Sequence, residues 1–316
     1  MKHFIATLAI ALAATTASAR DNIHVAGSST VLPYASIVAE LFGDNTEYPT
    51  PVVESGGSGS GQKRLCQGLG YNTIDIANSS SLMKAETIEA CEPVIGEIAE
   101  VRIGYDGIVF ATSHENEGFD NLTTEQLFKA LRNGSPYTKW SEVDPSLPDV
   151  KILVYLPGTK HGTREVFEKN VMLDGCKKAG FYDTLGKDGC YDVRTDGQSV
   201  DIDGDYTETL ASIESNKDGI GVFGLAFLLN NTDKIYAATV EGVEANVDTI
   251  SSGEYPVSRP LQFYVKLAHL DMVPGLKEYV QFFVADEIAG PGGPLETYGL
   301  VPDPELAKTQ AMVAAW

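Results

Sequence analysis

The stretch Glu54–Leu65, ESGGSGSGQKRL, constrains the fold of this chain more than any other. A short apolar run at residues 51–53 enters it and a helical pattern follows, so it predicts a strand, a tight loop and a helix start. Its glycines lack a Cβ, which lets the backbone approach a ligand closely. Free N–H groups, hydroxyls and the positive end of a helix dipole meet at such a loop, which suits an anion.

The same order of strand, loop and helix occurs three times in the first third of the chain. The predicted strands are Ile23–Ala26, Pro51–Val53 and Ile74–Ala77, and the helices that follow them are Val31–Phe42, Gln62–Leu69 and Ala85–Cys91. Each loop carries Ser, Gly or Thr at the carboxyl end of its strand, where open α/β sheets bind ligands. We therefore expect an α/β sheet with a ligand site at that edge.

Two apolar stretches predict strands that cross between two domains. Ile98–Ala111 leaves the first domain and Pro260–Val265 returns to it. Between them the pattern predicts a helix capped by Thr123 and ending at Leu131, a strand at Lys151–Leu156, a helix starting near Gly162 or Thr163, a polar excursion at Asp174–Asp205, a helix at Tyr206–Asn216 and strands at Ile220–Phe223 and Ile235–Val240. We expect a first domain of residues 20–105 and 259–316, covered by a helix at Gly275–Ala285, and a second domain of residues 106–258.

The amino terminus has the pattern of an export signal. Lys2 and His3 precede an apolar stretch that is too short to span a bilayer, and Ala17–Ala19 form a small-residue cleavage site. We expect a soluble periplasmic protein. The formal net charge of −21 makes nucleic acid and anionic membrane surfaces poor partners.

Export makes disulfides the expected state of the four cysteines, which allow three connectivities. We predict nearest-neighbour pairing, Cys66 with Cys91 and Cys176 with Cys190, because each pair closes a loop of modest length. A metal site is the weaker interpretation, since no CxxC pair is present.

Several motifs that would indicate enzymes or metal sites are incomplete. Lys63 stands one place late for a nucleotide-binding P-loop, and the hydroxyl that should follow the lysine is missing. The run Asp201-x-Asp203-x-Asp205 starts like a calcium loop but lacks its glycine and its final glutamate. No G-x-S-x-G nucleophile elbow occurs. We expect neither catalytic residues, a metal nor a cofactor.

Four short loops rich in Ser, Thr and Gly remain, and each lies between a predicted strand and a predicted helix. They are residues 27–30, 57–61, 78–81 and 161–164, the last with an arginine in the first helical turn. One such loop alone is more often a helix cap than a ligand site. Four together favour an oxyanion site.

The segments AGSSTVLP, GGSGSGQKRL, DIANSS, GYDGIVFA, HGTREVF and YPVSRPL, in this order and spacing, resemble the phosphate-binding proteins of bacterial phosphate ABC transporters. The resemblance runs through essentially the whole chain after the export signal. It implies a type II periplasmic binding protein, with two α/β domains, two crossover strands and a ligand held in the central cleft.

The resemblance also implies site residues. In the first domain these are Ser29 and Thr30, Ser58 with Gly59 and Ser60 beside it, and Ser80; in the second they are Gly162, Thr163 and Arg164, whose guanidinium suits phosphate.

The chain departs from the family pattern at three places. His161 stands where serine is usual, and its side chain either donates a hydrogen bond, favours a more negative ligand when protonated, or faces solvent. Ser81 stands where many relatives have arginine. Some relatives have aspartate at the Ser80 position, to accept the proton of hydrogen phosphate. Asp106 is our candidate for that acceptor; otherwise it only shapes the hinge turn.

The resemblance implies an exported, monomeric, non-enzymatic protein that captures inorganic phosphate and presents it to the membrane permease of an ABC transporter. Three alternatives stay open. The ligand is another oxyanion, such as sulfate, molybdate or a phosphonate; the protein is an exported phosphoester hydrolase; or it is a sensor or attachment protein on the same fold.

Overall fold

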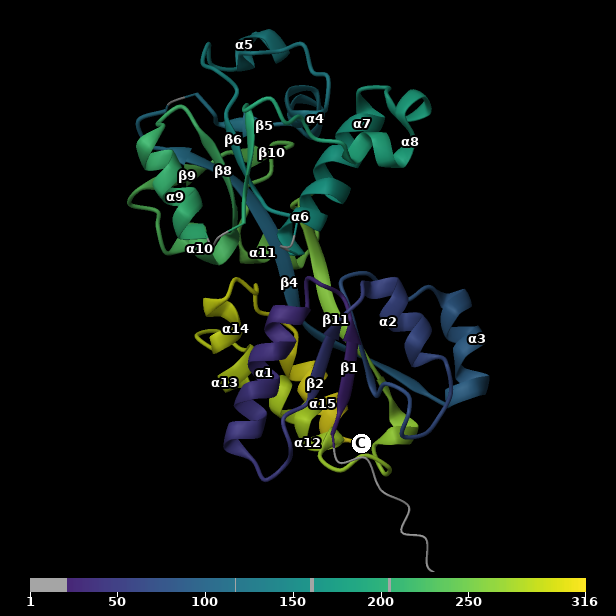
Figure 1. Ribbon diagram of the computed structural model, residues 1–316. Coiled ribbons are helices and arrows are strands. Elements are labelled where there is room, and N and C mark those ends of the chain that lie inside the picture. The colour runs from purple at the N-terminus through teal and green to yellow at the C-terminus, as the bar shows by residue number, and fades with distance from the viewer. Residues whose placement is uncertain (1–21, 117, 160–161, 204–205) are drawn as a thin grey trace, which may run out of the picture.

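The computed structural model describes residues 22–116, 118–159, 162–203 and 206–316. The chain forms two lobes joined by two long strands, β4 (Ile98–Ser113) and β11 (Ser258–Lys266), that run side by side (Figure 1). These strands pair antiparallel from Ile98 opposite Lys266 to Gly107 opposite Ser258. The expected two-domain α/β fold with two crossing strands is confirmed.

One sheet runs through both lobes in the order β2-β1-β3-β11-β4-β8-β6-β7, with β9 also paired to β4. Its other strands are β1 (His24–Gly27), β2 (Val52–Ser55), β3 (Ile76–Ser79), β6 (Val154–Pro157), β7 (Ser199–Ile202), β8 (Ile220–Gly224) and β9 (Ile235–Ala237). β1 lies parallel between β2 and β3, so the ends of all three meet at one edge of the first lobe. A separate two-stranded sheet pairs β5 (Asn121–Leu122) with β10 (Thr239–Val240).

Helices cover the sheet in both lobes (Figure 1). Those of the first lobe are α1 (Leu32–Asn45), α2 (Ser58–Leu65), α3 (Ala85–Ile95), α12 (Leu276–Phe283), α13 (Asp286–Ala289), α14 (Pro294–Thr297) and α15 (Leu306–Ala314), with a 3-10 turn at Leu267–His269. Those of the second are α4 (Thr124–Leu131), α5 (Trp140–Val143), α6 (Gly162–Val166), which continues as a π-helix over Phe167–Leu173, α7 (Asp174–Lys178), α8 (Tyr182–Tyr191), α9 (Tyr206–Ser215), α10 (Leu225–Leu229) and α11 (Val247–Ser251). Thr123 caps α4 as expected, in a capping box with Gln126.

Each lobe has its own apolar core, because the alternating faces of the sheet bury side chains beneath helices. Phe110, Phe128 and Trp140 are fully buried in the second lobe, and Phe42 and Tyr279 in the first. A smaller cluster lies under α2 and α3. The lobes therefore have separate cores, with β4 and β11 connecting them.

Helix α2 begins four residues earlier than expected, at Ser58 instead of Gln62. Gly57 supplies the positive φ of 81° that turns the chain into the helix. Gly61 then lies against β1, where an added Cβ would come within 2.6 Å of the Gly27 Cα. Residues 58–61 of the predicted loop 57–61 are thus helical, and the glycine at position 61 permits close packing on the strand.

Two other expectations were wrong in detail. The polar segment 174–205 is not simply an excursion, since it contains α7 and α8 and returns to the sheet as β7, parallel to β6. The expected strand Ile235–Val240 divides in two, because the chain leaves β4 after Ala237 and pairs with β5 from Thr239.

The structure contains both predicted disulfides. Cys66–Cys91 ties the end of α2 to α3, and Cys176–Cys190 ties α7 to α8. None of the helices in the described ranges has the length and apolarity needed to cross a bilayer. The expected export signal lies outside the described residues.

Candidate anion-binding cleft

Three serine hydroxyls from the first-lobe loops meet at the shared edge of β1, β2 and β3. The Ser28 Oγ donates to the Ser80 Oγ at 3.1 Å, and the Ser58 and Ser80 Oγ atoms lie 3.2 Å apart. The backbone N–H of Ser80 also donates to the Ser58 Oγ at 3.1 Å. The three loops therefore come together, as the strand order in the sequence predicts.

Ser28 was missing from the expected site residues. It is buried, and its Oγ also accepts from the backbone N–H of Thr30 at 3.2 Å, ahead of α1. Ser29, which was expected to bind the ligand, is only partly buried beside it. Three successive hydroxyl residues, Ser28, Ser29 and Thr30, do not reveal from the sequence which hydroxyl turns inward.

A buried arginine, Arg259, lies where the two lobes meet. Its Nη2 donates to the Thr30 Oγ1 at 2.6 Å, and its Nη1 lies 3.3 Å from the Glu165 Oε2 of the second lobe. The antiparallel register places it opposite Asp106, with 3.6 Å between the Arg259 Nε and the Asp106 Oδ2. Arg259 thus connects the first loop, the crossing strand β4 and helix α6. Sequence reasoning missed it as a site residue, although an arginine in the YPVSRPL segment of a crossing strand was the available signal.

Asp106 lies at the floor of the cleft and is only 2% exposed. Burial raises the pKa of its carboxyl, while Arg259 lowers it and Glu165 raises it further. A separation of 3.6 Å is too long for a hydrogen bond, so the Oδ2 accepts none from any residue that the structure describes. This oxygen is therefore a buried acceptor without a donor among the described residues.

The second lobe contributes the start of α6, at Gly162. Thr163 lines the cleft, and its Oγ1 is buried next to the Tyr206 hydroxyl. Among the described residues, this Oγ1 has no hydrogen-bond partner at normal geometry. His161 lies outside the described residues. Thr163 thus lines the cleft, and a ligand contact by Gly162 or Thr163 stays a prediction.

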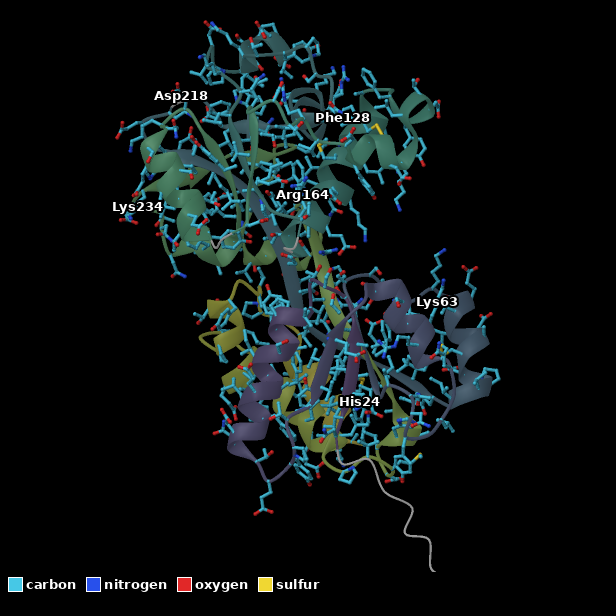
Figure 2. All side chains as sticks on the ribbon, viewed as in Figure 1. His24, Lys63, Phe128, Arg164, Asp218 and Lys234 are labelled. Carbon is cyan, nitrogen blue, oxygen red and sulfur yellow. A yellow bond between two sulfur atoms is a disulfide. The ribbon has the colours of Figure 1, made fainter. Side chains whose placement is uncertain are left out.

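Arg164 lies apart from this cluster, within the second lobe, where Figure 2 labels it near the junction. Its Nε lies 3.0 Å from the Glu168 Oε1, and its Nη1 donates to the Asp201 Oδ1 at 2.6 Å. The same Nη1 donates to the carbonyl of Pro157 at 3.2 Å. In this arrangement the guanidinium is neutralised by its own lobe, and its contact with an anion stays a prediction.

Glu165 points across the junction from α6. The Thr30 hydroxyl donates to its Oε2 at 3.3 Å, and Lys169 donates to its Oε1 at 2.5 Å. Burial raises the pKa of Glu165, but its hydrogen bond with Lys169 and the charge of Arg259 outweigh this and hold the pKa below its usual range. A negative side chain therefore contacts Thr30, which lines the cleft, and Arg259, which donates to Thr30.

A cavity of about 420 Å³ lies between the lobes, and Thr30, Asp106 and Thr163 are part of its lining. Polar side chains from both lobes reach it, with Thr30 from the first lobe and Thr163 from the second. In the ranges that the structure describes, no group of three or more His, Cys, Asp or Glu side chains is placed to hold a metal ion.

Residues 12–287 match the model of the PBP superfamily domain. Phosphate-binding protein PstS of Staphylococcus haemolyticus is 30% identical over 286 residues, which cover 88% of this chain and 80% of that protein. The protein of the same name from Staphylococcus aureus strain USA300 is 28% identical over 284 residues, 88% of this chain and 77% of the relative.

Solved structures share the fold. A possible phosphate-binding protein from Planctomyces limnophilus aligns with a TM-score of 0.73 at 24% identity, over 93% of this chain and 97% of the other. A phosphate ABC transporter substrate-binding protein from Clostridium perfringens, described as putative and solved with bound phosphate, aligns with a TM-score of 0.54 at 22% identity, over 89% and 99%. The chain therefore belongs to the PBP superfamily and, within it, to the PstS family of phosphate-binding proteins.

Proposed function

We propose that this protein is exported, captures inorganic phosphate between its two lobes and delivers it to the membrane permease of an ABC transporter. One observation carries the proposal: the hydroxyl loops around Ser58 and Ser80 converge beside Thr30, which the buried Arg259 holds. The curated relatives named phosphate-binding protein PstS support the same ligand. The role is binding and release without catalysis.

The proposed contacts come from both lobes, so binding favours closure. Thr30, Ser58 and Ser80 donate from the first lobe, and Thr163 and the backbone at Gly162 donate from the second. Strands β4 and β11 connect the lobes, which makes them the place for a hinge. We assign residues 20–105 and 259–316 to one moving domain and residues 106–258 to the other.

Asp106 supplies selectivity in this proposal. Its Oδ2 has no hydrogen-bond donor among the described residues, and hydrogen phosphate brings a hydroxyl that satisfies it. Sulfate has no proton at neutral pH, so it would leave a buried carboxylate facing an anion, which is costly. A preference for sulfate over phosphate has one observation in its favour. Burial raises the pKa of Asp106, and a protonated Asp106 would donate a hydrogen bond to sulfate.

Titration calorimetry at neutral pH tests the proposal with inorganic phosphate and sulfate on the processed protein. We expect a phosphate Kd of about 1 µM or tighter, a binding free energy of about 8 kcal/mol, and much weaker sulfate binding. Ser58→Ala should weaken phosphate about tenfold, because a hydrogen bond to a charged group contributes about 1.5 kcal/mol.

Ser215→Ala is the matched control, since its Oγ donates only to the Ala211 carbonyl within α9 among the described contacts. Absent phosphate binding, or equal affinity for both anions, would contradict the proposal. Tighter sulfate binding would support the alternative ligand.

A further inference from the structure

The cavity between the lobes extends beyond the proposed anion contacts into an aromatic region. Its lining includes Tyr34 and Tyr298 from the first lobe and Tyr206 and Phe227 from the second. A volume of about 420 Å³ lies within the range of about 300–1,000 Å³ that is typical of sites for organic ligands. A single phosphate ion does not need these rings.

The second-lobe wall of this region is rigid. The rings of Tyr206 and Phe227 lie 5.4 Å apart at 56°, and Phe227 stacks on the fully buried Phe223 at 5.2 Å and 1°. Because Phe223 belongs to the core, Phe227 is held in place while part of its ring faces the cleft. A fixed, partly exposed aromatic face is typical of a binding surface.

The first-lobe wall stands opposite, on α1 and at the end of α14. Figure 1 shows α14 directly across the junction from α10, which carries Phe227. Tyr298 is 63% exposed, although an aromatic side chain gains free energy when it is buried. Hinge closure would bring these two aromatic walls toward whatever lies between them.

The aromatic region is continuous with the anion contacts, because Thr30, Asp106 and Thr163 line the same cavity. We propose that the cleft also accepts a phosphate monoester or a phosphonate that carries a flat apolar group. The anionic end binds at Thr30 and Thr163, and the organic group lies between Tyr298 and Phe227. The proposal rests on the proposed function for its anionic end and goes beyond it in ligand class.

Titration calorimetry with inorganic phosphate, methylphosphonate and phenylphosphonate tests this inference on the full mature chain. These phosphonates cannot be hydrolysed, and they differ in the size of the apolar group. We expect phenylphosphonate to bind at least tenfold more tightly than methylphosphonate. Phe227→Ala and Tyr298→Ala should each reduce that ratio at least fivefold, while the Kd of inorganic phosphate changes less than about twofold.

Tyr182→Ala is the matched control, since Tyr182 is 39% exposed on α8, away from the cavity lining. Tyr298 is so exposed that its truncation leaves the fold intact, and thermal melting checks Phe227→Ala. Equal affinity for the two phosphonates, or an equal loss for all three anions in the variants, would overturn the inference. Phosphate binding without phenylphosphonate binding overturns the inference alone, and binding of none of the three overturns the proposed function as well.

Discussion

Replacing Glu165 with glutamine tests how the cleft balances its charges. The Glu165 Oε2 lies 3.3 Å from the Thr30 Oγ1, which is proposed to face phosphate, and 3.3 Å from the Nη1 of Arg259, which holds Thr30. An anion bound there meets this carboxylate at close range. Glutamine has nearly the same shape and removes the negative charge, so we expect Glu165→Gln to bind phosphate more tightly.

The size of the expected gain in phosphate-binding free energy follows from the distance between the two charges and from the solvent exposure of Glu165. Two like unit charges about 5 Å apart repel by about 3 kcal/mol at an effective dielectric constant of about 20. The Glu165 side chain is 33% exposed, so solvent and salt reduce this repulsion to about 1.5 kcal/mol. The variant also loses an ion pair across the junction, which is worth about 0.5 kcal/mol to closure. The net gain of about 1 kcal/mol corresponds to roughly fivefold tighter binding.

Calorimetry at low and high salt measures this gain, which should be larger at low salt. Glu125→Gln is the control, because Glu125 forms an equivalent i,i+4 pair with Lys129 on α4, outside the residues that line the cavity. If Glu165→Gln binds phosphate no better than the wild type while Glu125→Gln is also unchanged, Glu165 does not face the anion and the placement of the site is wrong.

Three further changes have defined outcomes. Asp106→Asn should narrow the difference between the Kd values for phosphate and sulfate in calorimetry, and unchanged selectivity would remove Asp106 from that role. Burial raises the pKa of Asp106, so its ionised form destabilises the fold above the folded-state pKa, and this effect vanishes as pH falls below the ordinary value of 3.8. In urea unfolding, Asp106→Asn should therefore be more stable than the wild type at pH 7 and lose that advantage in acid; an advantage that does not change with pH would contradict this. Gly61→Ala should lower the free energy of unfolding by about 1–3 kcal/mol, because the added Cβ would meet the backbone of β1. Gly59→Ala is the control: open space surrounds Gly59, so this change should raise the free energy of unfolding by about 0.5 kcal/mol. Equal effects of the two changes would refute the packing argument. Replacing both Cys66 and Cys91 with serine should lower the free energy of unfolding by about 3 kcal/mol. Reductant should then cause no further loss of stability through this disulfide, because the variant lacks it.

The repeated strand, loop and helix units made the convergence of the first-lobe loops predictable. Parallel neighbouring strands end at one edge of a sheet, so loops that follow β1, β2 and β3 must lie close together. Ser58 and Ser80 are in contact for that reason. The disulfides were also predictable, since cysteines close in sequence on consecutive helices pair readily once export is inferred.

The charged floor of the cleft was not predictable in the same way. Thr30 and Arg259 are 229 positions apart, and their contact depends on the register of β11 against β4. Arg164 illustrates the converse. A loop that resembles an anion motif suggested a free cation, whereas Glu168 and Asp201, on separate elements, engage it.

The sequence by itself determined the α/β class, the two crossing strands, the paired cysteines and the loops that offer hydroxyl and N–H donors. These features depend on local periodicity, glycine conformation and short-range spacing, all of which can be identified in the sequence. Tertiary structure alone decided that Ser28 turns inward, that Arg259 and Glu165 meet at Thr30, and that aromatic rings continue the cleft. Side-chain direction and charge pairing depend on which distant segments pack together, and this packing cannot be inferred from helix or strand periodicity.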